Sequence, residues 1–319
     1  MKKVAWLITA ASLVLAGCIL FGGMMMALGW DFTKFSTVKY ETNTHEITEQ
    51  VSRIQIETKT ANTVFLPADE DVCKVVCCEA ENKQHSVYVE DGCLKVQYVN
   101  EKKWYEYIGL HFETSKITVY LPREVYESLC IDIDTGHVNI PSDFQFGTVD
   151  ISGHTGDISV GASASERMCI TTSTGDITVS DTTAGSMELK VSTGKIVISN
   201  VACLGDVKLQ VSTGKSVVTD LTCRNFSTSG NTGDLSLDQV VAAEKITIQR
   251  TTGDIQFTAC DAANFFVKTD TGDVSGTLLS DKVFVYETST GRVDLPKTVT
   301  GGKFEVITST GDIRLKIVD

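Results

Sequence analysis

Apolar and polar residues alternate from residue 129 to residue 319 in a pattern that repeats every 19 or 20 residues. A Thr-Gly dipeptide marks each repeat. Its ten glycines are Gly136, Gly156, Gly175, Gly194, Gly214, Gly233, Gly253, Gly272, Gly291 and Gly311. A constant short period over such a length predicts a repeat protein, in which each unit packs on its neighbours.

When the repeats are aligned on this glycine, four positions are apolar in nearly all of them. They lie seven and five residues before the glycine, and two and four residues after it; the departures are Thr228, Ser216 and Gly276. Alternation with a period of two predicts two short, half-buried strands in each repeat. The apolar phase slips by one residue across Thr-Gly, so the chain must turn a corner there, and glycine permits such a corner. A polar linker that often holds one apolar residue, such as Val201 or Leu221, suggests a third and less regular side.

These features predict an all-β fold, a parallel β-solenoid that resembles a single-stranded β-helix. About ten coils of 19–20 residues would stack in chain order and in register. The alternative is an antiparallel sandwich or barrel, but hairpins would place Asn-Gly or Asp-Gly turns at alternating offsets. A turn at one constant offset favours the solenoid.

The first thirty residues predict a membrane helix. No charged residue occurs in residues 4–30, which is longer than the roughly 20 residues that a membrane span needs. Lys2 and Lys3 precede this segment, so the positive-inside rule predicts a single-pass protein whose C-terminal part is extracytoplasmic. Two alternatives stay open. Leu15-Ala16-Gly17-Cys18 has the form of a lipobox, with lipid attached to Cys18, and a cleaved signal segment would share the same composition.

Residues 31–128 are rich in strand patterns but irregular, and we expect them to form the N-terminal cap of the solenoid, whose regular part is residues 129–319. Residues 60–67 look like a degenerate corner and strand, and residues 85–98 look like a hairpin with its turn at Glu90-Asp91-Gly92. Trp104, Tyr105 and Tyr107 are the expected packing aromatics of this cap. At the other end, Arg314 and Lys316 would lie on the last strand and discourage edge-to-edge growth.

The residue after each repeat glycine is most often an aspartate. A row of carboxylates suggests a weak calcium hypothesis, because this hard cation needs several oxygens. The candidate ligands are Asp157, Asp176, Asp234, Asp254 and Asp273. Lys195 and Lys215 interrupt the row, so we expect turn chemistry instead, in which the carboxylate accepts backbone N–H groups. No cofactor and no metal is therefore predicted.

Cysteine usage leaves the redox state open. The chain has 10 cysteines, and Cys203 and Cys223 each lie nine residues after a repeat glycine in adjacent coils. Their Cα atoms would be close enough for a disulfide. The alternative, which we favour, is a stacked pair of reduced thiols.

Charge and motif content argue against several functions. The net charge of −13 disfavours nucleic acid as a partner. The chain has five histidines, and only His154, with Asp157 nearby, suggests a weak pair. Without a nucleophile or a lid this predicts no enzyme. A polysaccharide-active β-helix enzyme is the remaining enzymatic alternative.

The repeated unit, as in residues 173–177 (Ser-Thr-Gly-Asp-Ile), resembles the DUF4097 family of bacterial envelope proteins described as "putative adhesins". Residues 21–23, 30–34 and 39–43 are similar to its membrane-anchored members. The resemblance implies a β-strand repeat fold outside the membrane and no catalytic residues. It leaves two functions: a surface module that binds a cell-wall glycan or a surface protein, or a membrane-tethered accessory or sensor of envelope stress that acts through a membrane partner.

Overall fold

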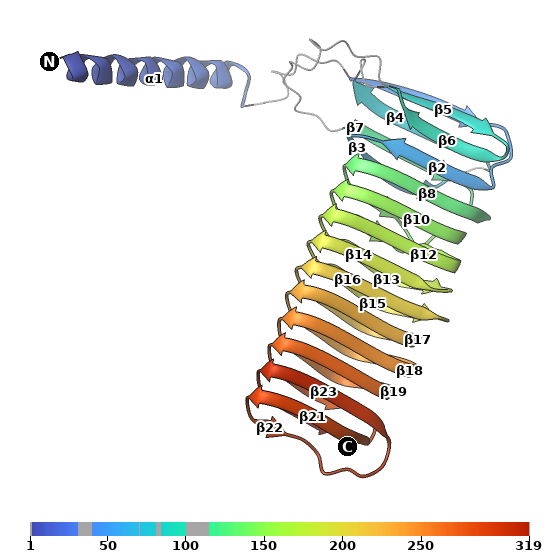
Figure 1. Cartoon of the computed structure of the whole chain (residues 1–319). Helices are drawn as coiled ribbons and strands as arrows, with labels where there is room; N and C mark the ends of the chain where they lie inside the picture. The colour runs from blue at the N-terminus through green and yellow to red at the C-terminus, as the bar shows by residue number, and fades with distance from the viewer. Residues whose placement is uncertain (1, 31–39, 70, 81–83, 100–114, 319) are drawn as a thin grey trace.

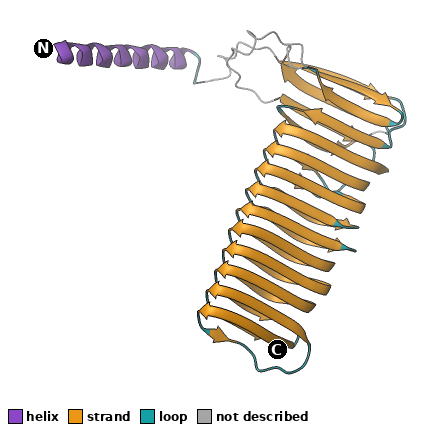
Figure 2. Ribbon diagram, viewed as in Figure 1, coloured by secondary structure: helices purple, strands orange, loops and turns teal. Residues whose placement is uncertain are grey.

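The computed structural model describes residues 2–30, 40–69, 71–80, 84–99 and 115–318. They form one helix, α1 (Lys2–Ala27), followed by strands that belong to one continuous sheet. Figure 1 and Figure 2 show the strands stacked side by side along one axis, with every β-coil wound in the same direction. The predicted cap aromatics Trp104, Tyr105 and Tyr107 lie outside the described residues.

The strand bounds follow the repeat. Strands before the first Thr-Gly corner are β1 (Tyr40–Ile47), β2 (Arg53–Thr58), β3 (Ala61–Pro67), β4 (Cys73–Ala80), β5 (His85–Glu90), β6 (Cys93–Tyr98), β7 (Ser115–Leu121) and β8 (Val125–Thr135). The regular coils continue with β9 (Val138–Ile140), β10 (Gln145–Thr155), β11 (Ile158–Val160), β12 (Ser163–Thr174), β13 (Ile177–Ala184), β14 (Met187–Thr193), β15 (Ile196–Cys203), β16 (Asp206–Thr213), β17 (Ser216–Thr232), β18 (Leu235–Thr252) and β19 (Ile255–Thr271). The last strands are β20 (Val274–Leu278), β21 (Lys282–Thr290), β22 (Val293–Asp294), β23 (Gly302–Thr310) and β24 (Ile313–Ile317).

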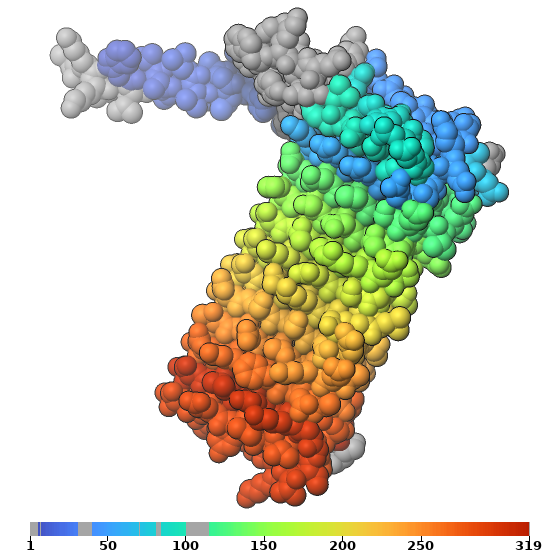
Figure 3. Space-filling view, turned by 45° about the vertical axis from the view of Figure 1, so that its right-hand side comes forward, coloured from blue at the N-terminus to red at the C-terminus, as the bar shows by residue number. Residues whose placement is uncertain are grey.

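The predicted parallel β-solenoid is confirmed. β10 pairs in parallel with β8 on one side and β12 on the other, so that Ile151 lies beside Ile131 and Ile170. The second strands of the same coils, β9, β11 and β13, pair in the same way. The apolar positions of successive coils therefore form buried ladders that run the length of the molecule. In the space-filling view the coils make one unbroken column (Figure 3).

The Thr-Gly corners require glycine for two reasons. At Gly175 the backbone has φ 133°, a region that residues with a Cβ rarely adopt. In addition, a Cβ on Gly175 would lie 2.2 Å from the carbonyl oxygen of Gly156 in the preceding coil. The glycines thus stack directly on one another. Their N–H groups continue the ladder, and Gly156 donates to the carbonyl of Thr174 at 2.9 Å.

A second corner, which sequence reasoning missed, lies six residues after the glycine. Asp181, Asn200 and Asp220 have φ of 54°, 53° and 51° there, in the left-handed region. Asp and Asn tolerate this conformation better than other non-glycine residues. The Asn200 side chain donates to Asp181 Oδ1 at 2.9 Å, which links the corners of adjacent coils. The recurrence of Asp or Asn at this offset was the available signal.

At the N-terminal end, the coils are not stacked in chain order. The coil formed by β2 and β3 pairs in parallel with β8 and β9, and on its other side with β6 and β7. The parallel stack thus extends into residues 53–121. Antiparallel strands then cover the outermost coil: β5 pairs with β6 in the predicted hairpin, β4 pairs with β7, and β1 pairs with β4. This end of the core is sealed, and the inward residues Leu94 and Val119 are fully buried.

At the C-terminal end, too, the coils are not stacked in chain order, but no antiparallel strands cover the outermost coil among the described residues. The expectation that coils follow chain order was therefore wrong at both ends. β23 pairs with β19 on one side and β21 on the other (Figure 1). β24 lies likewise between β20 and β22. The last repeat of the chain is therefore inserted before the penultimate one. Arg314 consequently lies within the stack, between Ser275 and Asp294, and not at its edge as predicted, whereas Lys316 pairs with Thr277 on one side alone. The edge strand is β21, where the inward-facing Tyr286 is 56% exposed.

The apolar helix that the sequence predicts is present. Within α1, residues Ile8–Ala27 have a mean hydropathy of 2.0 and a length sufficient to cross a membrane. A membrane anchor and a signal sequence share these properties.

Candidate functional site

The corner aspartates are engaged in bonds between coils. Asp157 Oδ1 accepts the backbone N–H of Asp176 at 2.9 Å, and Asp176 Oδ1 accepts that of Lys195 at 2.8 Å. The turn chemistry that the sequence suggested thus acts on the next coil and not within the same turn. His137 has the same role, because its Nδ1 accepts the N–H of Asp157 at 3.1 Å. His137 Nδ1 also lies 3.4 Å from Asp157 Oδ2, so the histidine next to this carboxylate is His137 and not the predicted His154.

The exchange of the last two coils changes the order of this row. Asp234, Asp254, Asp273 and Asp312 are consecutive in space, and each carboxylate accepts the N–H of the next residue in the row. The run ends at Arg292, whose N–H donates to Asp312 Oδ1 at 2.8 Å. Lysine cannot accept such a bond, so Lys195 and Lys215 interrupt the row.

The aspartate row does not gather metal ligands in the part of the chain that the structure describes. No group of three or more His, Cys, Asp or Glu side chains is placed there to hold a metal ion. One oxygen of each bonded carboxylate is already occupied by a backbone N–H. The calcium hypothesis for Asp157, Asp176, Asp234, Asp254 and Asp273 stays a prediction without a ligand cluster to support it.

Cys203 and Cys223 lie in adjacent coils, as their spacing suggested, and both are buried thiols. The residues before them, Ala202 and Thr222, are paired in parallel across β15 and β17. Burial raises the pKa of Cys223 to about 12, with a further contribution from Cys203, and burial also raises the pKa of Cys203. Such thiols are poor nucleophiles and poor metal ligands at neutral pH.

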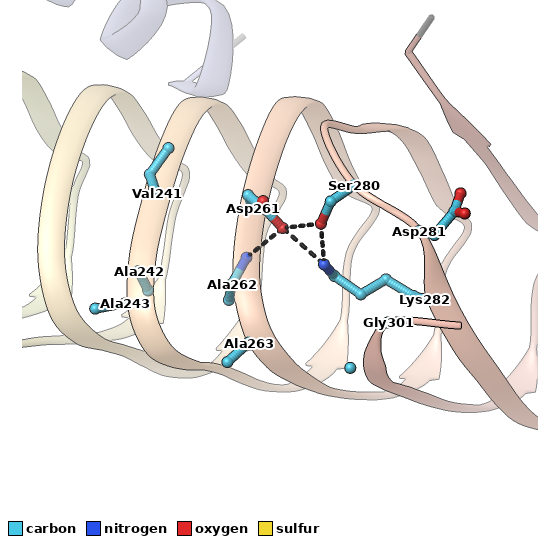
Figure 4. Close-up of a pocket in the computed structure, with 11 residues that line it drawn as sticks. Val241, Ala242, Ala243, Asp261, Ala262, Ala263, Ser280, Asp281, Lys282 and Gly301 are labelled. Atoms are coloured by element: carbon cyan, nitrogen blue, oxygen red, sulfur yellow. Dashed lines mark hydrogen bonds and ion pairs between the residues drawn. The ribbon is translucent and has the colours of Figure 1, made fainter. Parts of the chain in front are cut away.

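A shallow groove of about 610 Å³ lies on the third side of the last coils. Its walls are mostly alanine and glycine, and its polar centre is Asp261, Ser280 and Lys282 (Figure 4). The Lys282 ammonium lies 2.7 Å from Asp261 Oδ1, and Ser280 donates to the same oxygen at 2.8 Å. Burial alone would raise the pKa of Asp261, but hydrogen bonds from Lys282 and Ser280 and the lysine charge outweigh it, so the pKa is lowered.

This cluster has the members of a Ser-Lys catalytic pair but not its chemistry. Lys282 donates to Ser280, and a lysine activates serine as a base only when it is neutral. The Lys282 side chain is only 3% exposed and forms an ion pair with the adjacent Asp261 carboxylate. The arrangement can fix the loop at residues 280–282 and offer a binding surface, but it does not supply a nucleophile.

A buried relay in the cap also resembles catalytic machinery. His85 Nδ1 lies 2.6 Å from Glu79 Oε2, and Thr58 Oγ1 lies 2.8 Å from His85 Nε2. The side chains of His85 and Glu79 are 3% and 2% exposed, so a substrate cannot reach them. Asn43 donates to the second carboxylate oxygen, and the group joins β1, β2, β4 and β5. Its role is to hold the cap together.

Inside the solenoid, the side chain of Arg250 explains two of the three departures in the apolar ladder. It donates to Ser216 Oγ at 2.9 Å and to Thr228 Oγ1 at 3.3 Å. The sequence marked Ser216 and Thr228 as exceptions but gave no reason to connect them with an arginine. A groove of about 580 Å³ crosses the outer face of these coils between the long side chains of Lys190, Gln210, Gln249 and Lys268, and Gly230 and Arg250 are among the residues that line it.

The comparisons with known proteins decide the family. The Toastrack DUF4097 family model matches residues 51–210 and 202–319, which together cover most of the chain. The chain belongs to the Toastrack DUF4097 family. The resemblance of its repeat to that family is thereby confirmed. No curated protein matches this Toastrack chain.

Several solved structures are similar to this Toastrack protein. A "putative adhesin" from Bacteroides fragilis NCTC 9343 is 13% identical with a TM-score of 0.46, over 88% of this chain and 97% of that chain. A "putative adhesin" from Parabacteroides distasonis ATCC 8503 is 11% identical with a TM-score of 0.48, over 88% and 98%. A "putative lipid binding protein" from the same organism is 13% identical with a TM-score of 0.48, over 86% and 97%. These names describe those proteins and assign no ligand to the Toastrack chain.

Proposed function

We propose that this protein is a non-enzymatic interaction module of the cell envelope, held by α1 in the membrane and displayed on its outer side. The observation that carries the proposal is the joining of an apolar N-terminal helix to one unbroken stack of coils. Coils that stack on one another around a single continuous core form an elongated rod. The sealed end of the rod follows the helix in the chain, and the open end carries the C-terminal coils.

The polar clusters support binding in preference to catalysis. Asp261 and Lys282 neutralise each other, Glu79 and His85 are inaccessible, and the corner aspartates are bonded to backbone N–H groups. Each group is committed to holding coils together. The groups left for a partner are the outward Ser, Thr, Lys and amide side chains of the coils, which suit hydrogen bonding to a glycan or to a protein surface. The acidic net charge disfavours nucleic acid.

The first experiment tests the location of the full-length protein. A protease added to intact cells should digest residues 40–318, and intact-mass analysis of the membrane-extracted chain should retain α1. A chain that begins at Cys18 with a lipid attached would replace the helix anchor by a lipoprotein anchor. Protection from protease in intact cells, together with digestion after lysis, would contradict display outside the membrane.

The second experiment tests interaction. The full-length protein in nanodiscs is offered to purified cell-wall glycans, peptidoglycan and extracellular matrix proteins, with empty nanodiscs as control. Saturable binding to one of these classes is the expected result. Absence of binding to all of them, with co-purification of one membrane protein from its own cells, would favour the sensor hypothesis instead.

A further inference from the structure

Arg250 is an arginine inside a core made of aliphatic ladders. It lies on β18 at an inward position, and it is 4% exposed. Its guanidinium reaches over the neighbouring coil, since Nη1 is 2.6 Å from where a Cβ on Gly230 would be. Ser216, its partner, belongs to the coil beyond that one. The side chain therefore runs along the axis of the solenoid and spans three coils.

The sequence makes room for this side chain at three positions. Gly230 is the register neighbour of both Val211 and Arg250, so the missing side chain leaves the guanidinium its space. Ser216 and Thr228 stand where the other repeats have apolar residues, and both are buried. Three small or polar residues around one buried cation indicate a built polar site within the core.

The hydrogen bonds of Arg250 are incomplete. Nη2 donates to Ser216 and Thr228, but Nε and Nη1 are buried without a hydrogen-bond partner. Among the described residues, no carboxylate lies within ion-pair distance of this guanidinium. The nearest acidic influence is Asp234, an exposed corner residue whose Oδ1 accepts the N–H of Asp254. Arg250 and Gly230 also line the outer groove of about 580 Å³, together with the charged residues Lys190, Lys268 and Asp270.

An uncompensated guanidinium in this position is costly. Arginine does not lose its proton in proteins, so burial cannot be relieved by neutralisation. Burial lowers the pKa of Arg250, which reports the same penalty. Native proteins pair buried charges and satisfy buried donors. Hydroxyl groups of Ser216 and Thr228 satisfy donors but carry no charge, so a negative charge is missing.

We propose that a small monovalent inorganic anion, of the size of chloride, binds beside Arg250 in the interior and holds together the coils around Gly214, Gly233 and Gly253. An anion accepts from the unpartnered N–H groups and neutralises the charge, whereas a water molecule does only the first. The size limit follows from the packing, because the guanidinium already takes the place of the missing side chain at Gly230, with Nη1 2.6 Å from where its Cβ would be. Tetrahedral oxyanions such as sulfate are expected to be too large.

The test uses the full-length protein in detergent, with thermal unfolding measured in sodium chloride, bromide, sulfate and gluconate at constant ionic strength. We expect the Tm to rise saturably with chloride and bromide relative to gluconate, because a ligand that binds only the folded state stabilises it. Arg250→Met should abolish this halide dependence. Arg224→Met, at an exposed arginine paired with Asp206, is the matched control and should retain it. Equal Tm values in chloride, bromide and gluconate would overturn the proposal. So would a sulfate effect that Arg250→Met removes, because the general stabilisation by sulfate does not depend on Arg250.

Two further measurements keep the test decisive if Arg250→Met does not fold. The triple variant Ser216→Val, Thr228→Ile and Arg250→Val restores the apolar ladder and should fold without halide dependence, since well-packed apolar residues often replace a buried charge site without loss of stability. Crystals of the wild-type protein grown in bromide should show an anomalous peak within about 3.5 Å of the guanidinium. A site filled by water alone in bromide would exclude the anion.

Discussion

Asp312 donates its backbone N–H to Oδ1 of Asp273 at 2.8 Å, although 39 residues separate them in the chain. Between the two in sequence lies a whole repeat, which forms the outermost coil. The row of corner aspartates is therefore continuous in space only because the last repeat is inserted before the penultimate one. A rod built this way ends on a coil that is held by a later part of the chain.

The exchanged coil order predicts which engineered disulfides form. Lys268 and Glu287 each pair in register with Ile307, so like positions lie about 4.8 Å apart in neighbouring coils and about 9.6 Å apart across two. A disulfide requires Cα atoms within about 7 Å. The variant Lys268→Cys with Ile307→Cys should cross-link, whereas Lys268→Cys with Glu287→Cys should not. Linked peptides identified by mass spectrometry report the result, and the reverse outcome would mean that the coils follow chain order.

Gly233→Ala should destabilise the solenoid strongly. The residue has φ 132°, and a Cβ would lie 1.9 Å from the carbonyl oxygen of Gly214. Backbone strain and overpacking together should cost about 2–4 kcal/mol in the free energy of unfolding. Gly153→Ala is the control, because its Cβ would make an ordinary contact at 3.4 Å with Ile158. Urea unfolding of both variants gives the comparison, and equal losses would contradict the requirement for glycine at the corner.

Asp176→Ala should remove the acceptor for the Lys195 N–H and destabilise the protein by about 0.5–1.5 kcal/mol. Asp176→Asn retains an acceptor oxygen and should lose much less. Lys215→Ala, at a break in the row, should change the unfolding free energy by less than about 0.5 kcal/mol.

Chelation by EDTA should leave the Tm of the wild type unchanged if the aspartate row serves only to accept backbone N–H groups. A drop in Tm on chelation would revive the calcium hypothesis.

Asp261 should make the C-terminal coils sensitive to acid. Its pKa is lower in the folded protein than in the unfolded chain, so the folded state binds fewer protons. Its contribution to stability is therefore complete above the ordinary aspartate pKa of about 3.9, and it is lost as the pH falls through the lower folded value. The Tm of Asp261→Asn should fall less steeply than that of the wild type between about pH 5 and pH 3. Asp281→Asn, in the same groove, should retain the wild-type slope; a parallel profile for Asp261→Asn would refute the assignment.

Cys223 should resist alkylation in the folded protein. Its pKa of about 12 leaves very little thiolate at neutral pH, and the thiol is buried. Iodoacetamide should modify the exposed Cys130 first and reach Cys203 and Cys223 only after denaturation. Peptide mapping under non-reducing conditions provides the measurement. A peptide pair linked through Cys203 and Cys223 would show that the disulfide forms.

Several residues of the polar clusters could be noticed in the sequence, but the contacts between them could not be predicted. Ser216 and Thr228 could be recognised as exceptions because the aligned repeats show which residue type to expect at each position. Their link to Arg250 was not, since an arginine on a strand is ordinarily an outward residue. The ion pair between Lys282 and Asp261 could not be predicted for a similar reason. The two residues meet on the irregular third side, where no repeat position indicates which residue type to expect.

The sequence alone determined the coil. Period-2 alternation fixes which residues face the core, and the phase slip at Thr-Gly fixes the corner, because both depend only on neighbours in the chain. The order of the coils at both ends was decided only in three dimensions. Each coil offers the same backbone hydrogen bonds on its two edges, so the repeat pattern cannot state which coil lies next. That choice depends on packing between distant parts of the chain, and its result is that the Phe304 ring lies between those of Phe265 and Phe284.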